Sequence, residues 1–302
     1  MKTRFTLYFA LAICCFTIPA NATDTLYKPF VLASENQGSL ADITETTITK
    51  LSESGFVVVG QYSPISGTNI VVVTNNILQQ VAAKSNRGGY AAGQRISISE
   101  TEGKTEVSYM NPVYLQYAYR LEGDLQPVLE QLTNSLGMQK TCGGGDKKMN
   151  AKKLSKYHYM FGMQYFDDPS RLGSFSSHEE AVAAVEAGLA RADDALTQVY
   201  RIDIPDTDQT VFGVGMKMTN EDEEDLDSKF QMSVVDFEGC RKRAYFPYEV
   251  LVKGSEVEAL HMRFRMAVHF PNLSMMGKHG FTKLMSAPGA IEDALEDMVD
   301  AK

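Results

Sequence analysis

The sequence lacks tryptophan, has only 4 cysteines in 302 residues, and carries no reaction motif of a well-understood enzyme class. Its glycine run Gly143–Gly145 is not followed by the Lys-Ser/Thr pair of a phosphate-binding loop. A G-x-S-x-G nucleophile elbow is absent, and the cysteines lack the close Cys or His spacing of a zinc site. The sequence therefore predicts no catalytic residue and no cofactor.

Basic residues are also in deficit, with 29 Lys and Arg against 38 Asp and Glu, a formal charge of −9. Nucleic-acid binding needs clustered Lys and Arg, so this balance argues against nucleic acid as a partner. The hydrophobic share of 44% and charged share of 22% are ordinary for a globular protein and exclude wholesale disorder. The length allows two domains of roughly 100–200 residues each.

Residues 1–22 have the three parts of a secretory signal peptide. Lys2 and Arg4 form a positive start, residues 5–18 an apolar core, and residues 20–22 an A-x-A cleavage site. The core is shorter than the roughly 20 apolar residues that span a bilayer. No later segment is long and apolar enough to span one, so we expect a soluble mature protein in the periplasm or secreted, without a membrane span.

Cleavage would remove two of the cysteines and leave 27 basic and 38 acidic residues, a formal charge of −11. Cys142 and Cys240 would remain, and an oxidising compartment permits a disulfide between them. That bridge would close a loop of about a hundred residues and contribute up to roughly 4–5 kcal/mol in the chain-entropy model. The alternative is two unpaired thiols.

A glycine-rich, charged segment at 139–156 predicts a flexible linker between two units, 23–138 and 157–302. Each unit reads β-α-β-β-β-β-α, which predicts an α+β fold of two tandem units, each a curved antiparallel sheet backed by two helices. The alternative is two unrelated α+β domains. In the first unit we expect helices at 39–55, 77–84 and 125–136, and strands at 30–33, 56–62, 70–74, 95–99 and 106–110.

The second unit is expected to repeat this order. Ser177 and Glu180 form a capping box, and apolar residues then recur at steps of three and four, which predicts a helix over 177–196. Gly254 should turn a hairpin as Gly103 does in the first unit. We expect strands at 157–166, 200–204, 211–218, 249–253 and 258–270, and a last helix at 291–299.

Several short motifs resemble the bacterial family called domain of unknown function 302. The resemblance covers about residues 30–137, with weaker features in the second unit. It rests on Gly55–Val59, the turn at Gly103, Tyr109–Pro112 before a helix, Phe246–Val252 and Ala287–Glu292. It implies a fold similar to that of the TATA-binding protein, with a helix-backed curved sheet. It implies no activity and supplies no catalytic residues.

The segment His261–His269 alternates in character and predicts a strand with two different faces. Met262, Phe264, Met266 and Val268 would face the core. The opposite face would carry a cationic row that could hold a carboxylate or phosphate, or could instead lie in solvent or pair with the protein's own carboxylates. The row is His261, Arg263, Arg265 and His269.

Met275, Met276 and His279 place soft ligands close together and could suit copper in an exported protein, although methionine is also common core filler. The acidic run Glu221–Asp227 lacks the glycine placement and closing glutamate of a calcium loop, so we expect a solvated loop, which could face Arg241–Arg243.

The leading hypothesis is therefore a soluble exported protein without enzymatic activity that binds a small anion or a protein partner. One alternative is an enzyme, a hydrolase or isomerase, whose residues converge only in three dimensions; a deep pocket with two or more buried ionisable groups would favour it. The other alternative is a periplasmic copper-handling protein.

Overall fold

The computed structural model describes residues 25–191, 195–219, 221–237 and 239–300. The predicted signal peptide at 1–22 lies outside these residues. The described chain combines helices with antiparallel sheets, so the predicted α+β class is confirmed. Among the described helices, not one is both long and apolar enough to cross a bilayer.

The first sheet has six strands in the order β2-β3-β4-β5-β1-β6, all antiparallel to their neighbours. A two-residue turn joins β4 to β5, where Thr101 lies opposite Lys104 and Gly103 has a φ of +78°. The strands are β1 (Phe30–Asn36), β2 (Val57–Tyr62), β3 (Thr68–Thr74), β4 (Gln94–Thr101), β5 (Lys104–Met110) and β6 (Lys140–Cys142).

The second sheet has five strands in the order β7-β11-β10-β9-β8. Read from the other edge this is β8-β9-β10-β11-β7, which matches the β2-β3-β4-β5-β1 order of the first sheet. Its hairpin turn also falls at the predicted glycine, because Lys253 lies opposite Glu256 and Gly254 has a φ of +57°. The strands are β7 (Ser170–Ser174), β8 (Leu196–Asp203), β9 (Gln209–Met216), β10 (Tyr248–Lys253) and β11 (Glu256–Ala259).

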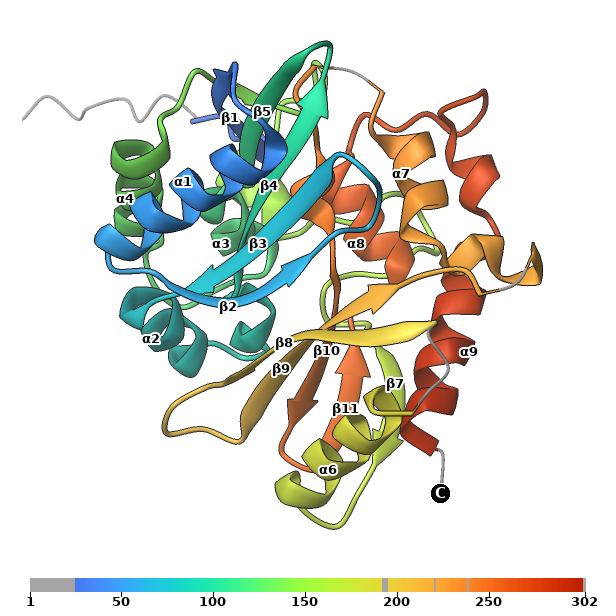
Figure 1. The fold of residues 1–302 in the computed structure, drawn as a ribbon. Coiled ribbons are helices and arrows are strands. Elements are labelled where there is room, and N and C mark those ends of the chain that lie inside the picture. Colours follow the sequence, from blue (N-terminus) through green and yellow to red (C-terminus); the bar gives the residue numbers. More distant parts are fainter. Residues whose placement is uncertain (1–24, 192–194, 220, 238, 301–302) are drawn as a thin grey trace, which may run out of the picture.

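A serine cap begins the first helix that covers the outer face of each sheet. Ser39 accepts a hydrogen bond from the Asp42 backbone N–H at the start of α1 (Leu40–Glu53), and Ser177 accepts one from the Glu180 N–H at the start of α6 (His178–Leu189). Helices α1 and α4 (Gln126–Leu136) pack on the first sheet, and α6 and α9 (Ala287–Asp300) on the second (Figure 1). The other helices are α2 (Asn76–Lys84), α3 (Pro112–Ala118), α5 (Ala151–Leu154), α7 (Ser228–Val235) and α8 (Met262–His269), with 3-10 turns η1 (Gly88–Ala91), η2 (Glu221–Leu226), η3 (Arg243–Tyr245) and η4 (Phe281–Leu284).

The sheet faces that carry no helices pack toward each other, so the layers run helices, sheet, sheet, helices (Figure 1). In the first sheet Val71 and Val73 face α1 and α4, whereas Ile70 and Val72 belong to the core shared with the second unit. The turn η1 reaches between the sheets, where the Gly89 N–H donates to Gln209. Antiparallel sheets commonly leave one face in water, but here both helix-free faces are buried.

Four local predictions differ from the structure. The helix predicted over 177–196 ends at Leu189, and Leu196 begins β8. The segment 157–166 forms bends and turns rather than a strand, and the predicted strand 258–270 divides into β11 and α8. The expected linker at 139–156 is built into the fold, because β6 pairs with β1 and α5 follows it. The Cys142–Cys240 disulfide then joins β6 to the second unit, with the two Cα atoms 6.2 Å apart.

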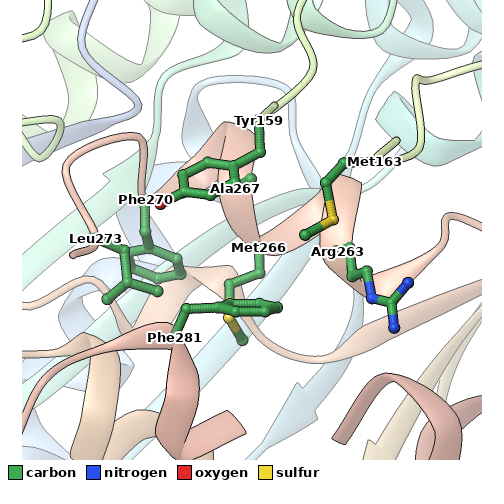
Figure 2. Close-up of a pocket in the computed structure, with 8 residues that line it drawn as sticks. All are labelled: Tyr159, Met163, Arg263, Met266, Ala267, Phe270, Leu273 and Phe281. Carbon is green, nitrogen blue, oxygen red and sulfur yellow. The ribbon is translucent and has the colours of Figure 1, made fainter. Parts of the chain in front are cut away.

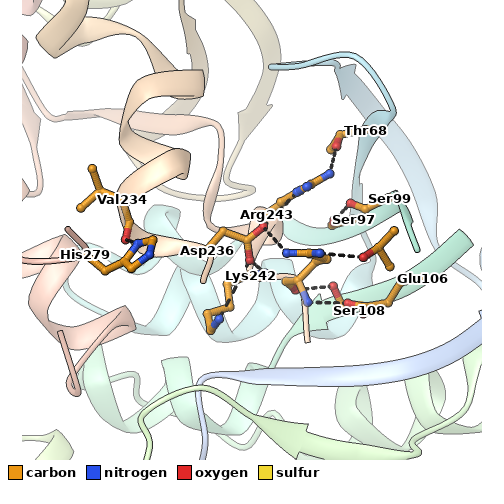
Figure 3. A network of polar contacts seen from close by, with 12 residues as sticks. Thr68, Ser97, Ser99, Glu106, Ser108, Val234, Asp236, Lys242, Arg243 and His279 are labelled. Carbon is orange, nitrogen blue, oxygen red and sulfur yellow. Dashed lines mark hydrogen bonds and ion pairs between the residues drawn. The ribbon is translucent and has the colours of Figure 1, made fainter. Parts of the chain in front are cut away.

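The insertion between β9 and β10 carries η2, α7 and η3 and is held against the first sheet by a polar network (Figure 3). Asp236 lies at its centre and accepts from Arg243 Nε at 3.0 Å and from the Lys242 backbone N–H at 2.9 Å. Ser108 of β5 donates to the Arg241 carbonyl at 2.7 Å. The basic triplet Arg241–Arg243 therefore pairs with Asp236 and with β4 and β5, while Asp227, at the end of the acidic run, caps α7.

Candidate functional site

The predicted cationic row does not line one strand face, because its residues belong to α8 and to its cap. His261 is the N-cap and accepts from the Arg263 backbone N–H at 3.2 Å. Arg265 and His269, one helical turn apart, are fully buried between the two units. His261 and Arg263 are half-buried and keep partial contact with solvent. The hypothesis of a four-residue anion site on a strand is therefore wrong.

The inner side of α8 contributes instead to a buried charge cluster. Arg265 Nε lies 2.9 Å from Glu249 Oε2 on β10, and Arg95 on β4 forms an ion pair with the other carboxylate oxygen. Arg265 Nη2 also donates to the carbonyls of Tyr245 at 2.6 Å and Pro247 at 2.7 Å. One carboxylate thus bridges two guanidinium groups from different units.

Aromatic rings and the His269 imidazole surround this cluster. The Arg265 guanidinium lies 4.0 Å from the centre of the Tyr245 ring and 4.5 Å from that of Tyr248, which are cation–π contacts. Burial, together with the charges of Arg265 and Arg95, lowers the pKa of His269 well below its ordinary value. These groups are almost fully buried, so the cluster links the two sheets and is closed to solutes.

The outer side of α8 borders an apolar slot (Figure 2). The slot has a volume of about 10 Å³, which is room for about one water molecule. The rings of Tyr159 and Phe281 stack across it with their centres 6.4 Å apart, and the Arg263 guanidinium extends away from the ring cluster. Its lining residues are Tyr159, Met163, Arg263, Met266, Ala267, Phe270, Leu273 and Phe281.

The two chain segments that meet at this slot contain no carboxylate. Residues 147–166 and 259–291 lack Asp and Glu altogether in a protein with 38 of them, and they hold eight of its 15 methionines and four of its 5 histidines. They contact each other directly, because the Tyr157 hydroxyl donates to the Ala267 carbonyl at 2.8 Å. Gly144 and Gly145, just before the first segment, lie against Pro271 and Asn272.

We call the exposed residues of these two segments the carboxylate-free face. Its apolar members include Phe161, which is 100% exposed, and Met276, which is 78% exposed. Its exposed basic members are Lys147, Lys148, Lys152, Lys153, Lys156, Lys278 and Lys283. The face could have been found in the sequence by plotting carboxylates rather than net charge, but only the structure shows that its two segments meet.

An open hollow of roughly 730 Å³ beside this face mixes charges of both signs. Arg120 pairs with Asp167 at 3.1 Å, and this hydrogen bond lowers the pKa of the Asp167 carboxyl. His158 stacks on Tyr165 with ring centres 4.3 Å apart. Because Arg120 already has its own carboxylate, the hollow is a weaker candidate for an anion site than the carboxylate-free face.

The predicted copper ligands lie in the loop between α8 and α9. Met275 and Met276 are exposed, whereas the His279 ring stacks on Phe237 at 4.4 Å and its Nδ1 lies 3.1 Å from the Val234 carbonyl (Figure 3). Within the described parts of the chain, His, Cys, Asp and Glu side chains form no group of three or more that could hold a metal ion. A copper site would depend on thioether ligands, and it stays a prediction.

Comparisons with family models, with curated proteins and with solved structures find no match to this chain. The resemblance to domain of unknown function 302 therefore also stays a prediction, and the candidate site rests on its own geometry and charge.

Proposed function

We propose that this chain is an exported protein without enzymatic activity that binds an anionic partner through its carboxylate-free face. One observation carries the proposal: two segments distant in sequence, both without carboxylates, meet around one apolar slot. Segregation of positive charge onto one side of an acidic protein creates a field that orients the molecule toward anionic surfaces.

Exposed apolar side chains on the same face indicate that the partner offers apolar groups as well as negative charge. Single exposed apolar residues are ordinary on protein surfaces, but a group of them rimmed by polar residues is typical of an interaction site. Phe161, Met276 and Met285 are all largely exposed and are interspersed in sequence with the lysines. The partner we infer is therefore both anionic and amphipathic.

We further propose that the chain consists of two tandem units of the family it resembles, delivered to the periplasm or secreted after cleavage at 22. The shared order of five strands in the two sheets supports the tandem arrangement. The Cys142–Cys240 disulfide is compatible with an oxidising compartment.

The test of the binding function uses a probe that carries both properties. A fluorescent helical peptide of glutamate and leucine is titrated with the mature protein, beside a peptide in which glutamine replaces glutamate. We expect the acidic peptide to bind and its affinity to fall as salt is raised, because exposed charges are screened.

A triple variant with Lys152, Lys153 and Lys156 replaced by glutamine should weaken this binding. The matched control replaces Lys50, Lys84 and Lys104, which lie on α1, α2 and β5 away from the face. Equal loss in both triple variants would show that total charge, not this face, determines the binding. If neither the acidic peptide nor the anionic vesicles used below bind above the neutral probes, the proposed function is wrong.

A further inference from the structure

We infer that the anionic partner is the surface of a phospholipid bilayer, on which the protein lies peripherally; this inference rests on the proposed function and names its ligand class. The inference comes from three features of the carboxylate-free face: the form of its apolar residues, the position of those residues on loops, and the number of lysines around them.

The apolar residues of this face project outward, and the recess between them is filled. The slot between α8 and residues 159–163 has a volume of about 10 Å³, so its own lining side chains nearly fill it. Phe161 and Met276, in contrast, expose most of their surface. A protein partner would need matching recesses for these side chains, whereas a fluid bilayer accepts projecting apolar groups without any preformed shape.

The two exposed side chains lie at turns whose flanking residues line the slot. Phe161 precedes Gly162, which has a φ of +78°, and Met276 precedes Gly277, which has a φ of +102°. Positive φ is readily available to glycine and lets the chain reverse sharply. Tyr159 and Met163 flank the first turn and Leu273 and Phe281 flank the second, and all four residues line the slot. Both turns therefore border the same part of the surface.

Seven exposed lysines accompany these turns, five from 147–156 and two from 278–283. Long lysine side chains can keep the ammonium group at the level of lipid phosphates while their methylene groups cover apolar surface. Attraction to anionic lipid is worth about 1 kcal/mol per basic residue close to the surface, or about fivefold in partitioning. Two inserted apolar residues alone would give weak attachment, so stable binding needs both signals.

The absence of carboxylates gives this arrangement its direction. A protein with a formal charge near −11 after cleavage would be repelled from an anionic bilayer in most orientations. An approach through residues 147–166 and 259–291 brings seven exposed lysines to the headgroups, with Asp168 beside Phe161 as a carboxylate from outside these segments. The inference therefore includes a single orientation on the bilayer.

Flotation of the mature protein with large unilamellar vesicles tests the inference. One set of vesicles mixes phosphatidylglycerol with phosphatidylcholine, and the other contains phosphatidylcholine alone. We expect flotation only with the anionic set, and roughly a hundredfold weaker partitioning when Lys152, Lys153 and Lys156 become glutamine. The variant with Phe161→Ser and Met276→Ser should bind at least about tenfold more weakly.

The control variant Val57→Ser removes an apolar side chain that is also exposed, but on β2 outside the face. It should bind the anionic vesicles like the parent protein. Because all the substituted side chains are exposed, circular dichroism should show the same fold in every variant. Unchanged flotation of the Phe161→Ser, Met276→Ser variant would overturn the insertion of the two turns.

The outcomes separate this inference from the function on which it rests. Binding to the acidic peptide without binding to phosphatidylglycerol vesicles would overturn the lipid inference and indicate a protein partner, while the proposed function would stand. Absence of binding to either probe would overturn both. Equal flotation with both vesicle sets would also refute the inference, because it would remove the role of anionic lipid.

Discussion

Replacing Glu249 by glutamine should destabilise the protein strongly, although the two side chains have nearly the same shape. The change removes the carboxylate that bridges Arg95 and Arg265, both of which have no exposed surface. Breaking a buried ion pair from one side leaves uncompensated buried charge and typically costs about 3–5 kcal/mol. A domain is stable by about 5–15 kcal/mol in total, so urea denaturation followed by circular dichroism would resolve the loss easily.

A matched control shows whether burial causes the effect. Glu35 pairs with Lys104 at 3.2 Å on the surface, and Glu35→Gln should cost at most about 1 kcal/mol. Adding Arg95→Met to Glu249→Gln should restore part of the lost stability, because it removes one of the two uncompensated charges. A loss below about 1 kcal/mol in Glu249→Gln, equal to that of the surface control, would refute the view that this cluster fastens the units.

Three further predictions concern other parts of the molecule. Reducing the Cys142–Cys240 bridge should lower the free energy of unfolding by up to about 4–5 kcal/mol, measured by urea denaturation with and without a reductant; an unchanged midpoint would contradict it. Because the folded pKa of His269 is depressed, the unfolded chain binds more protons below pH about 6.5, so stability should fall with decreasing pH there by up to about 1.4 kcal/mol per unit for this group. His269→Gln should flatten that slope in denaturation curves at pH 5–7, and an identical slope would show that other groups determine it. If the loop at 274–280 binds copper, metal analysis after copper loading should find the ion and Met276→Ser should reduce it; absence of copper in the loaded parent protein removes the hypothesis.

Local patterns predicted the elements whose formation depends on neighbouring residues. The Ser39 and Ser177 caps, the start of a helix after each of them and the glycines at two hairpin turns are all found where the sequence places them. Each of these signals acts over a few residues, so the chain segment carries nearly all the information that fixes it.

The errors fall where distant residues decide the structure. His261–His269 alternates like a strand, but Arg265 and His269 are polar residues of a helix that is buried on most sides. The Glu249 carboxylate and the Tyr245 and Pro247 carbonyls compensate the buried charge of Arg265. Segment 139–156 has the composition of a linker, yet its strand β6 pairs with the free edge of β1. Neither partner lies near in sequence, so no window of residues could have revealed it.

The placement of the candidate site has the same explanation. Composition along the chain shows where carboxylates are missing, but a contact such as that between Tyr159 and Phe281 exists only after both sheets have packed. Net charge averaged over the whole chain concealed the face, because the remaining segments carry all the acidic residues.

The burial of both helix-free sheet faces has a consequence for how this chain could be dissected. Cutting it near residue 156 would give two fragments. Each fragment would expose a broad surface of valines, tyrosines and an arginine that is buried in the intact chain. Such fragments should aggregate when they are expressed separately and should fold only when they are expressed together. By the same reasoning, a free-standing ancestor of either half would have needed a second copy of itself to cover that surface.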